Sequence, residues 1–280
     1  MNDFKTLNIV SPEAIVSTEN EAKWAYLAEK YNNWQKNPVK IKGGIPHIIH
    51  HIWLGSPLPE KYTAFINSFK TLNPLWEYRL WTENEILTLD DFDGKAAFIK
   101  SKTWGAKSDI ARYAILSKFG GFYFDTDYEC IQPLDFLADR ASFIACIQTS
   151  SSPEFGNAML ACKAGHPLMK KLATNVRTVK TTEAMDNING TGPGYLTDTI
   201  FSHKDMLSAA DILLPSAFFF AVPNYKADSL TVPDEKKKFI FPETYGIHYW
   251  DQSWFDASFG AWLERKILRL MRKLGLKRQA

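Results

Sequence analysis

The sequence predicts an α/β fold, in which helices cover a central sheet. Strand-like apolar runs alternate with helix-like segments from residue 45 onward, which is typical of a parallel sheet with helical crossovers. Apolar residues make up 45% of the 280 residues, enough to fill a substantial core. An aromatic run over residues 120–124 leads directly into Asp125-Thr126-Asp127. Open α/β sheets bind their ligands where strands end, so we expect a functional site at these two aspartates.

An N-terminal helical arm, residues 1–42, is expected before the main domain. Ser11-Pro12-Glu13 has the pattern of a helix start, because proline is favoured in the first turn. Apolar and aromatic residues then recur at helical spacing, which indicates a packing face: Trp24, Leu27, Ala28, Tyr31 and Trp34.

The main domain is expected over residues 43–261, after Gly43-Gly44. Its helix over residues 107–118 ends at Gly120-Gly121, a helix stop signal, and so leads directly into a strand over residues 121–124. The other expected strands are 45–54, 76–81 and 143–148, the other helices are 59–72, 167–180 and 193–201, and residues 212–222 form an apolar, phenylalanine-rich segment.

Residues 262–280 are expected to form a basic amphipathic helix. From Glu264 to Ala280 there are seven basic residues and one acidic residue, and apolar residues recur along one helical stripe. Such a helix can lie on an anionic membrane surface through residues 263–278, or it can dock its apolar stripe on the core. The sequence leaves both alternatives open.

The composition excludes several classes of protein. Three cysteines outside any C-x-x-C pattern argue against a disulfide scaffold and a zinc ribbon, so we expect a reducing, cytoplasmic location. No signal peptide is recognisable, and no apolar stretch approaches the roughly 20 residues that span a bilayer. Basic residues outside the C-terminal segment are dispersed, so nucleic acid is not an expected partner.

Two carboxylates held one residue apart, those of Asp125 and Asp127, repel each other unless a positive charge lies between them. Hard divalent ions such as Mg²⁺ and Mn²⁺ prefer carboxylate oxygens and leave positions open for phosphate. Just upstream, Asp109 and Arg112 are three residues apart and share one helix face. They are either an ordinary surface ion pair or part of the same site. The pattern therefore predicts a site for a metal ion and a diphosphate.

Three ordered segments together resemble glycosyltransferase family 32, whose members contain a DXD motif: residues 45–55, 107–113 and 120–127. The resemblance extends to about residue 254 and reaches the clostridial glucosylating toxins more distantly. It implies a nucleotide-sugar-binding fold of the GT-A type, a Rossmann-like mixed sheet with helical additions. It also implies transfer with retention of the anomeric configuration.

The same resemblance implies donor-binding roles for five residues. Trp53 matches the tryptophan that stacks on the nucleobase in the toxin relatives, although the residue type alone equally suits a core tryptophan at a strand end. Ser108, Asp109 and Arg112 match a segment that contacts ribose, sugar hydroxyls and phosphate. Tyr123 matches a position that lines the nucleotide sugar.

The resemblance also implies the metal ligands. Asp127 is the expected first ligand, and Asp125 is shared between the metal site and the donor. His248 belongs to a segment that resembles the family's closing His…Ser-Trp motif, so it is the expected third ligand, although the toxins place a carboxylate near this position. Ser253 and Trp254 are expected to cover the diphosphate.

Residues 189–194, Asn-Gly-Thr-Gly-Pro-Gly, are expected to lead into a helix at Pro193. A chain this rich in glycine can approach a ligand with its backbone, and Gly192 matches the family's Gly-Pro element near the donor sugar. A flexible loop with no ligand remains an alternative.

The expected function is that of a metal-dependent, retaining glycosyltransferase. It would move a hexosyl group from a nucleoside diphosphate sugar, a UDP-sugar first of all, to a glycan or lipid-linked glycan acceptor, using Mn²⁺ or Mg²⁺ and Asp125 and Arg112 as catalytic residues. The resemblance suggests a role in bacterial capsule or surface polysaccharide synthesis. The C-terminal segment suggests a peripheral position on the inner face of the plasma membrane.

Two other functions stay open. A phosphatase of the haloacid dehalogenase type would use Asp125 as nucleophile, although its Asp-x-Asp motif usually lies near the start of the domain. A binding protein without catalysis could retain the fold and bind nucleotides or carbohydrates.

Overall fold

The computed structural model describes residues 2–8, 18–36, 40–148 and 152–251. The chain divides into two compact units, Met1–Trp250 and Asp251–Ala280. The fold described below is that of the first unit. The expected helix over residues 262–280, the expected domain boundary at residue 261, and Ser253 and Trp254 lie outside the described residues.

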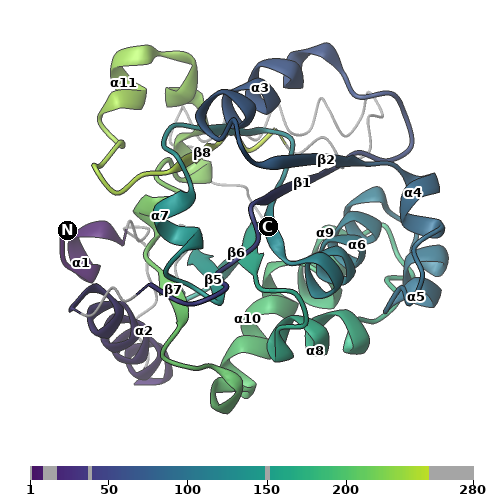
Figure 1. Cartoon of the computed structure of the whole chain (residues 1–280), viewed down its shortest axis with the longest axis horizontal. Helices are drawn as coiled ribbons and strands as arrows, with labels where there is room; N and C mark the ends of the chain where they lie inside the picture. The colour runs from purple at the N-terminus through teal and green to yellow at the C-terminus, as the bar shows by residue number, and fades with distance from the viewer. Residues whose placement is uncertain (1, 9–17, 37–39, 149–151, 252–280) are drawn as a thin grey trace, which may run out of the picture. The chain divides into compact units, whose positions relative to one another are not determined.

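A six-stranded mixed sheet forms the centre of the first unit (Figure 1). Its strand order is β2-β1-β3-β6-β5-β7. β1 runs parallel to β2 and β3, and β7 runs parallel to β5, whereas β6 is antiparallel to both of its neighbours. The strands are β1 (Ile48–Ile52), β2 (Glu77–Trp81), β3 (Gly121–Phe124), β5 (Phe143–Ile147), β6 (Phe155–Cys162) and β7 (Asp211–Leu214).

The α/β class and the mixed sheet that the resemblance implies are thus confirmed, although the alternation of strands and helices alone indicates a parallel sheet. The difference is β6, for which the sequence predicts no strand. All eight residues of β6 are buried, so the alternation of apolar and polar residues that marks a half-exposed strand is missing. Gly156 weakens the pattern further, and packing requires it, because a Cβ atom there would lie 2.2 Å from Cζ of Phe220.

Helices surround the sheet, and most of the expected ones are present. The expected helix over residues 167–180 ends at Asn175, whereas the expected helix over residues 59–72 consists of a short 3-10 turn followed by α3. Figure 1 shows α6, α8 and α10 gathered together, with α3 at the opposite end of the view. The α-helices are α1 (Phe4–Leu7), α2 (Thr18–Lys36), α3 (Thr63–Leu72), α4 (Glu83–Leu87), α5 (Lys95–Lys100), α6 (Trp104–Phe119), α7 (Asp135–Ala138), α8 (Pro167–Asn175), α9 (Ala184–Gly190), α10 (Pro193–Ser202) and α11 (Pro233–Lys237).

The N-terminal arm packs on the main core. Tyr31 and Trp34, two of the residues expected on its packing face, are buried. The ring of Tyr31 lies 6.0 Å from that of Phe218, and the ring of Trp34 lies 6.3 Å from that of Phe136. Among the described residues, no helix is both long enough and apolar enough to cross a bilayer.

Helix α6 is fixed at both ends by local sequence. The hydroxyl of Thr103 accepts a hydrogen bond from the N–H of Ala106 at 3.1 Å, which caps the first turn. At the other end Gly120 and Gly121 have φ values of 64° and 95°. A Cβ atom on Gly121 would lie 2.6 Å from the carbonyl oxygen of Ile48, so β3 can approach β1 only without a side chain there. The two glycines therefore join α6 directly to the strand that precedes the aspartates.

A second, two-stranded sheet returns the chain to the same place. β4 (Tyr128–Cys130) pairs antiparallel with β8 (Gly246–His248), and the register sets Tyr128 opposite His248. The N–H of Tyr249 extends the pairing by donating to the carbonyl oxygen of Asp127 at 3.0 Å. This pairing brings a distant segment of the chain to the two aspartates.

Candidate active site

Asp125, Asp127 and His248 lie together at the carboxyl end of β3. One ligand atom from each residue lies within 4.8 Å of the others. Nε2 of His248 is 3.3 Å from Oδ1 of Asp127. The Asp127 and His248 side chains are almost buried, whereas that of Asp125 is 29% exposed, so the group opens to solvent on the Asp125 side. The structure thus brings together the three residues expected to bind metal.

The His248 ring is held in place by its neighbours. It stacks on the ring of Tyr128, with centroids 4.7 Å apart and planes 5° apart, and the edge of Phe220 lies against it. Its Nδ1 atom is buried and has no hydrogen-bond partner among the described residues. A buried polar atom without a partner is costly, and in native proteins it commonly marks a place for water or an ion. Two carboxylates and an imidazole suit a divalent ion such as Mn²⁺, so these residues fit a metal site.

Arg112 connects Asp125, one of the three candidate metal ligands, to the rest of the site. Its Nη1 donates to the carbonyl oxygen of Asn157 at 2.6 Å, and its Nη2 donates to Oγ of Ser108 at 3.2 Å. Nη2 also lies 3.0 Å from Oδ1 of Asp109 and 3.3 Å from Oδ1 of Asp125. Asp109 and Arg112 are therefore a buried ion pair within the site, and the alternative of an ordinary surface pair is excluded.

Asp109 holds Arg112 and is itself held by two other residues. The amide of Asn157 donates to its Oδ1 at 2.8 Å, and the hydroxyl of Thr191 donates to its Oδ2 at 2.9 Å. Burial raises the pKa of Asp109 to about 6, although Arg112 and these hydrogen bonds oppose the rise. Burial lowers the pKa of Arg112, but Tyr123, Asp125 and Asp109 raise it by more. The pKa therefore lies above its ordinary value, and the guanidinium stays charged.

Tyr123 and Ser108 connect α6 to Asp125. The Tyr123 hydroxyl donates to Oδ1 of Asp125 at 2.6 Å and lies 3.4 Å from Oγ of Ser108. The guanidinium of Arg112 lies over the Tyr123 ring, 4.5 Å from its centroid. Burial raises the pKa of Asp125, the charge of Arg112 opposes the rise, and the charge of Asp127 adds to it.

Trp53 follows β1 at the same end of the sheet. Its side chain is only partly buried, its Nε1 donates to Oγ of Ser56 at 3.1 Å, and its ring lies 5.0 Å from that of Tyr62. The nearby Trp104, in the first turn of α6, is 44% exposed and packs against Gly55, which has a φ of 79°. Trp53 is thus not a fully buried core residue.

The glycine-rich segment contacts the site through Thr191, for which the sequence predicts no role of its own. Residues up to Gly190 belong to α9, so the segment is less open than a loop. The N–H of Gly192, a residue expected near the donor sugar, donates to the carbonyl oxygen of Asn187 at 2.8 Å. The Thr191 carbonyl oxygen accepts from the hydroxyl of Tyr113 at 2.8 Å, which holds the threonine against α6.

Asn157 is the second site residue that sequence reasoning missed. It lies in β6, next to the end of β3, where the N–H of Asp125 donates to the carbonyl oxygen of Ala158 at 2.9 Å. The one available signal was an amide side chain within the otherwise apolar run of residues 155–162. Because no strand is predicted over these residues, the sequence could not place the Asn157 amide beside β3.

The site therefore places the Asp125, Asp127 and His248 side chains beside the fixed guanidinium of Arg112. This arrangement is suited to binding a metal ion together with phosphate oxygens. One protein family model matches part of this chain. Residues 59–144 match the model described as the glycosyltransferase sugar-binding region containing a DXD motif. The match includes α6 and the two aspartates, and it does not reach His248.

Curated relatives agree with this match. Inositol phosphoceramide mannosyltransferase 1 of Schizosaccharomyces pombe is 26% identical over 79% of this chain and 66% of its own length. Inositol phosphoceramide mannosyltransferase 3 of the same organism is 30% identical over 47% of this chain and 37% of its own length. The chain thus spans less than two thirds of the length of these relatives.

Among solved structures, the ligand-free glycosyltransferase domain of the YGT toxin aligns with a TM-score of 0.47 at 12% identity, over 83% of this chain and 91% of that domain. The family match includes the DXD residues around which the site is built. Over residues 59–144 the chain is thus similar to the glycosyltransferases whose sugar-binding region contains a DXD motif.

Proposed function

We propose that the protein is a metal-dependent, retaining glycosyltransferase that moves a hexosyl group from a nucleoside diphosphate sugar to an acceptor hydroxyl. The observation that carries the proposal is the placement of Arg112 beside Asp125, which itself belongs to the Asp125, Asp127 and His248 group. Carboxylates attract a divalent ion and a guanidinium attracts phosphate, and a diphosphate leaving group needs both.

Asp127 and His248 would hold the metal, and Asp125 would share it with the donor. The closeness of the three ligand atoms is the observation that fits an ion here. When bound, Mn²⁺ or Mg²⁺ would act as a Lewis acid that stabilises the charge of the departing diphosphate.

The chain's own contribution to the reaction is a fixed positive charge. Arg112 donates to the Asn157 carbonyl and the Ser108 hydroxyl, so it needs little reorganisation when negative charge develops on the leaving group. Asp109 keeps Arg112 in this orientation. Tyr123 keeps Asp125 turned toward the same place, where its second oxygen can accept a ribose hydroxyl.

Retention is proposed to follow from attack on the same face as the leaving group. A double displacement would need a carboxylate free to act as nucleophile. Among the described residues of the site, Asp109 is engaged at both carboxylate oxygens by Arg112, Asn157 and Thr191, and the proposal assigns Asp125 and Asp127 to the ribose and the metal ion. The acceptor proton would then pass to the departing phosphate.

The identity of the donor and acceptor is proposed from the relatives' names. Both relatives are named as mannosyltransferases of inositol phosphoceramide. We therefore propose a nucleotide-linked mannose, beside the UDP-sugars, as a donor to test first. A glycan or lipid-linked acceptor fits these names. Trp53, partly exposed at the end of β1, is the proposed nucleobase contact. We propose a role in surface polysaccharide or glycolipid synthesis, at the inner face of the plasma membrane through residues 263–278.

The test is a panel of UDP-, GDP- and ADP-sugars, measured for release of nucleoside diphosphate with and without Mn²⁺. We expect one donor to be hydrolysed or transferred in a Mn²⁺-dependent manner and Asp127→Ala to abolish the reaction. The anomeric configuration of the product, followed by NMR, tests retention.

The same experiment separates the two other functions. A phosphoaspartate on Asp125 would establish the phosphatase chemistry. Tight binding of nucleotide without turnover, on any donor and acceptor, would establish a binding protein.

A further inference from the structure

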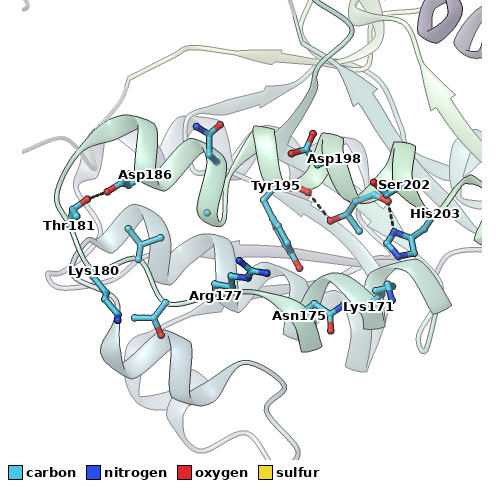
Figure 2. A pocket seen from close by; sticks show the side chains of 15 residues that line it. Lys171, Asn175, Arg177, Lys180, Thr181, Asp186, Tyr195, Asp198, Ser202 and His203 are labelled. Atoms are coloured by element: carbon cyan, nitrogen blue, oxygen red, sulfur yellow. Dashed lines mark hydrogen bonds between the residues drawn. The ribbon is translucent and has the colours of Figure 1, made fainter. Parts of the chain in front are cut away.

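A pocket lies outside the candidate active site, between α8, α9 and α10. It has a volume of about 650 Å³ and is also bordered by the chain between α8 and α9. Figure 2 shows Tyr195 reaching from α10 toward α8, with Arg177 at its side. Its lining includes Lys171, Asn175, Arg177, Lys180, Tyr195 and Asp198.

The pocket carries more positive charge than its surroundings neutralise. Among the described residues, none of the side chains of Lys171, Arg177 and Lys180 makes a hydrogen bond or an ion pair. The pocket is also lined by two acidic residues, Asp186, which is hydrogen bonded to the hydroxyl of Thr181, and Asp198, which lies apart from Arg177 in the view of Figure 2. The three cations exceed the two carboxylates by one positive charge, so the pocket attracts an anion.

The walls of the pocket are fixed rather than loose. The hydroxyl of Tyr195 donates to the carbonyl oxygen of Leu172 at 2.9 Å, which holds its ring between α10 and α8. The N–H of Val179 donates to the hydroxyl of Ser101 at 3.1 Å, and the N–H of Lys102 donates to the carbonyl oxygen of Val179 at 3.1 Å. These bonds anchor the segment that carries Arg177 and Lys180 to the chain just before α6.

We propose that this pocket binds the phosphate group of a small, hydroxyl-rich ligand, such as a sugar phosphate. A guanidinium binds phosphate oxygens through two parallel donors, and lysines add point charges. The amides of Asn175 and Asn189 and the ring of Tyr195 suit the hydroxyls and the apolar face of a sugar. The same chemistry is offered by a soluble phosphate ester and by a phospholipid headgroup.

The pocket is separate from the donor site but adjoins it through the backbone. None of its lining residues belongs to the group around Arg112 and Asp125. Gly190 borders the pocket, and the next residue, Thr191, donates to Asp109 at 2.9 Å. A ligand in the pocket would therefore stabilise the segment that holds Asp109.

The test is a titration of the full-length protein with glucose 6-phosphate, inorganic phosphate and glucose, followed by backbone-amide NMR. We expect glucose 6-phosphate to shift amides of residues 171–181 and 195–203, and Arg177→Gln to weaken its binding about tenfold. Lys170→Gln is the matched control, because Lys170 precedes Lys171 on α8 and does not line the pocket. Its affinity should equal that of the unmodified protein.

Three results would overturn the proposal: no amide shifts at the pocket, an equal response to neutral glucose, or unchanged affinity in both Arg177→Gln and Lys180→Gln. The spectra also show whether each variant is folded, and they do not depend on glycosyl transfer. Vesicles containing phosphatidylglycerol distinguish the two sources. Sedimentation that Arg177→Gln loses and Lys170→Gln keeps identifies a lipid headgroup, whereas glucose 6-phosphate binding without sedimentation identifies a soluble ester.

Discussion

Nε2 of His248 lies 3.3 Å from Oδ1 of Asp127, although Asp127 directly precedes β4 and His248 ends β8, more than a hundred residues further along the chain. The backbone fixes this contact, because β4 and β8 pair directly beside it. The imidazole is therefore placed before any ligand arrives.

The first prediction concerns this imidazole. We expect His248→Gln to weaken Mn²⁺ binding at least about tenfold. Changing a residue that only supports a metal ligand already lowers metal affinity by about tenfold or more, and His248 is itself a proposed ligand. Calorimetry or electron paramagnetic resonance of free Mn²⁺ measures the affinity. His47→Gln is the control, since His47 is an exposed residue that stacks on Trp76 before β1. Equal affinities in the two variants would mean that the imidazole of His248 has no role in binding the ion.

The second prediction concerns the pH dependence of the reaction. The pKa of Asp109 is raised to about 6, so its carboxylate is charged only above that pH and pairs fully with Arg112 there. We expect kcat/KM to fall as the pH drops through about 6. Thr191→Val removes a hydrogen bond that favours the carboxylate, so the pKa should rise and the acid limb should move about one pH unit higher.

The control for this shift is Thr174→Val, which removes an exposed hydroxyl on α8. An acid limb that stays in place in Thr191→Val would show that a group other than Asp109 sets it.

How much the sequence could predict depends on whether a contact is local. Asp125 and Asp127 follow a continuous apolar strand, and Asp109 and Arg112 are one helical turn apart, so their proximity follows from element type alone. His248 required the family resemblance, because nothing in its own segment indicates that β8 pairs with β4. Asn157 and Thr191 could not be predicted, since each reaches Asp109 only after β6 and α9 have packed beside α6.

The third prediction concerns a hydrogen-bonded cluster of Tyr249, Glu129 and Lys236 next to the paired strands β4 and β8. The hydroxyl of Tyr249 donates to Oε2 of Glu129 at 2.7 Å and accepts from Nζ of Lys236 at 2.8 Å. The cluster joins β4, the residue after β8, and α11. We expect Tyr249→Phe to lower the free energy of unfolding by about 1 kcal/mol and to weaken Mn²⁺ binding, because β8 carries His248.

Urea denaturation and a Mn²⁺ titration measure the two effects. Tyr225→Phe, at an exposed position, should change neither. Loss of stability without loss of Mn²⁺ affinity would show that the cluster supports the fold and not the site.

The fourth prediction separates backbone strain from side-chain contact. Gly43 and Gly55 both have positive φ values, 63° and 79°. A Cβ atom on Gly43 would meet no atom within 4 Å, whereas one on Gly55 would lie 2.6 Å from the Trp104 ring. We expect Gly43→Ala to cost about 1 kcal/mol through its backbone alone, and Gly55→Ala to cost more and to displace Trp104.

Thermal unfolding and tryptophan fluorescence provide the measurements, and UDP affinity shows whether the displacement reaches the proposed nucleobase contact at Trp53. Equal destabilisation by both substitutions would mean that the Trp104 ring moves aside at no cost.

The pairing of β4 with β8 also determines when the site forms during folding. Closing so long a stretch of chain costs entropy that is recovered only after the pairing is complete. Helix α6 and β3, which are adjacent in sequence, can form early, whereas the imidazole arrives only with the last described strand. A refolding chain will therefore regain its helical signal before it regains a complete set of metal ligands, and for that interval it will be folded in outline but unable to bind the ion.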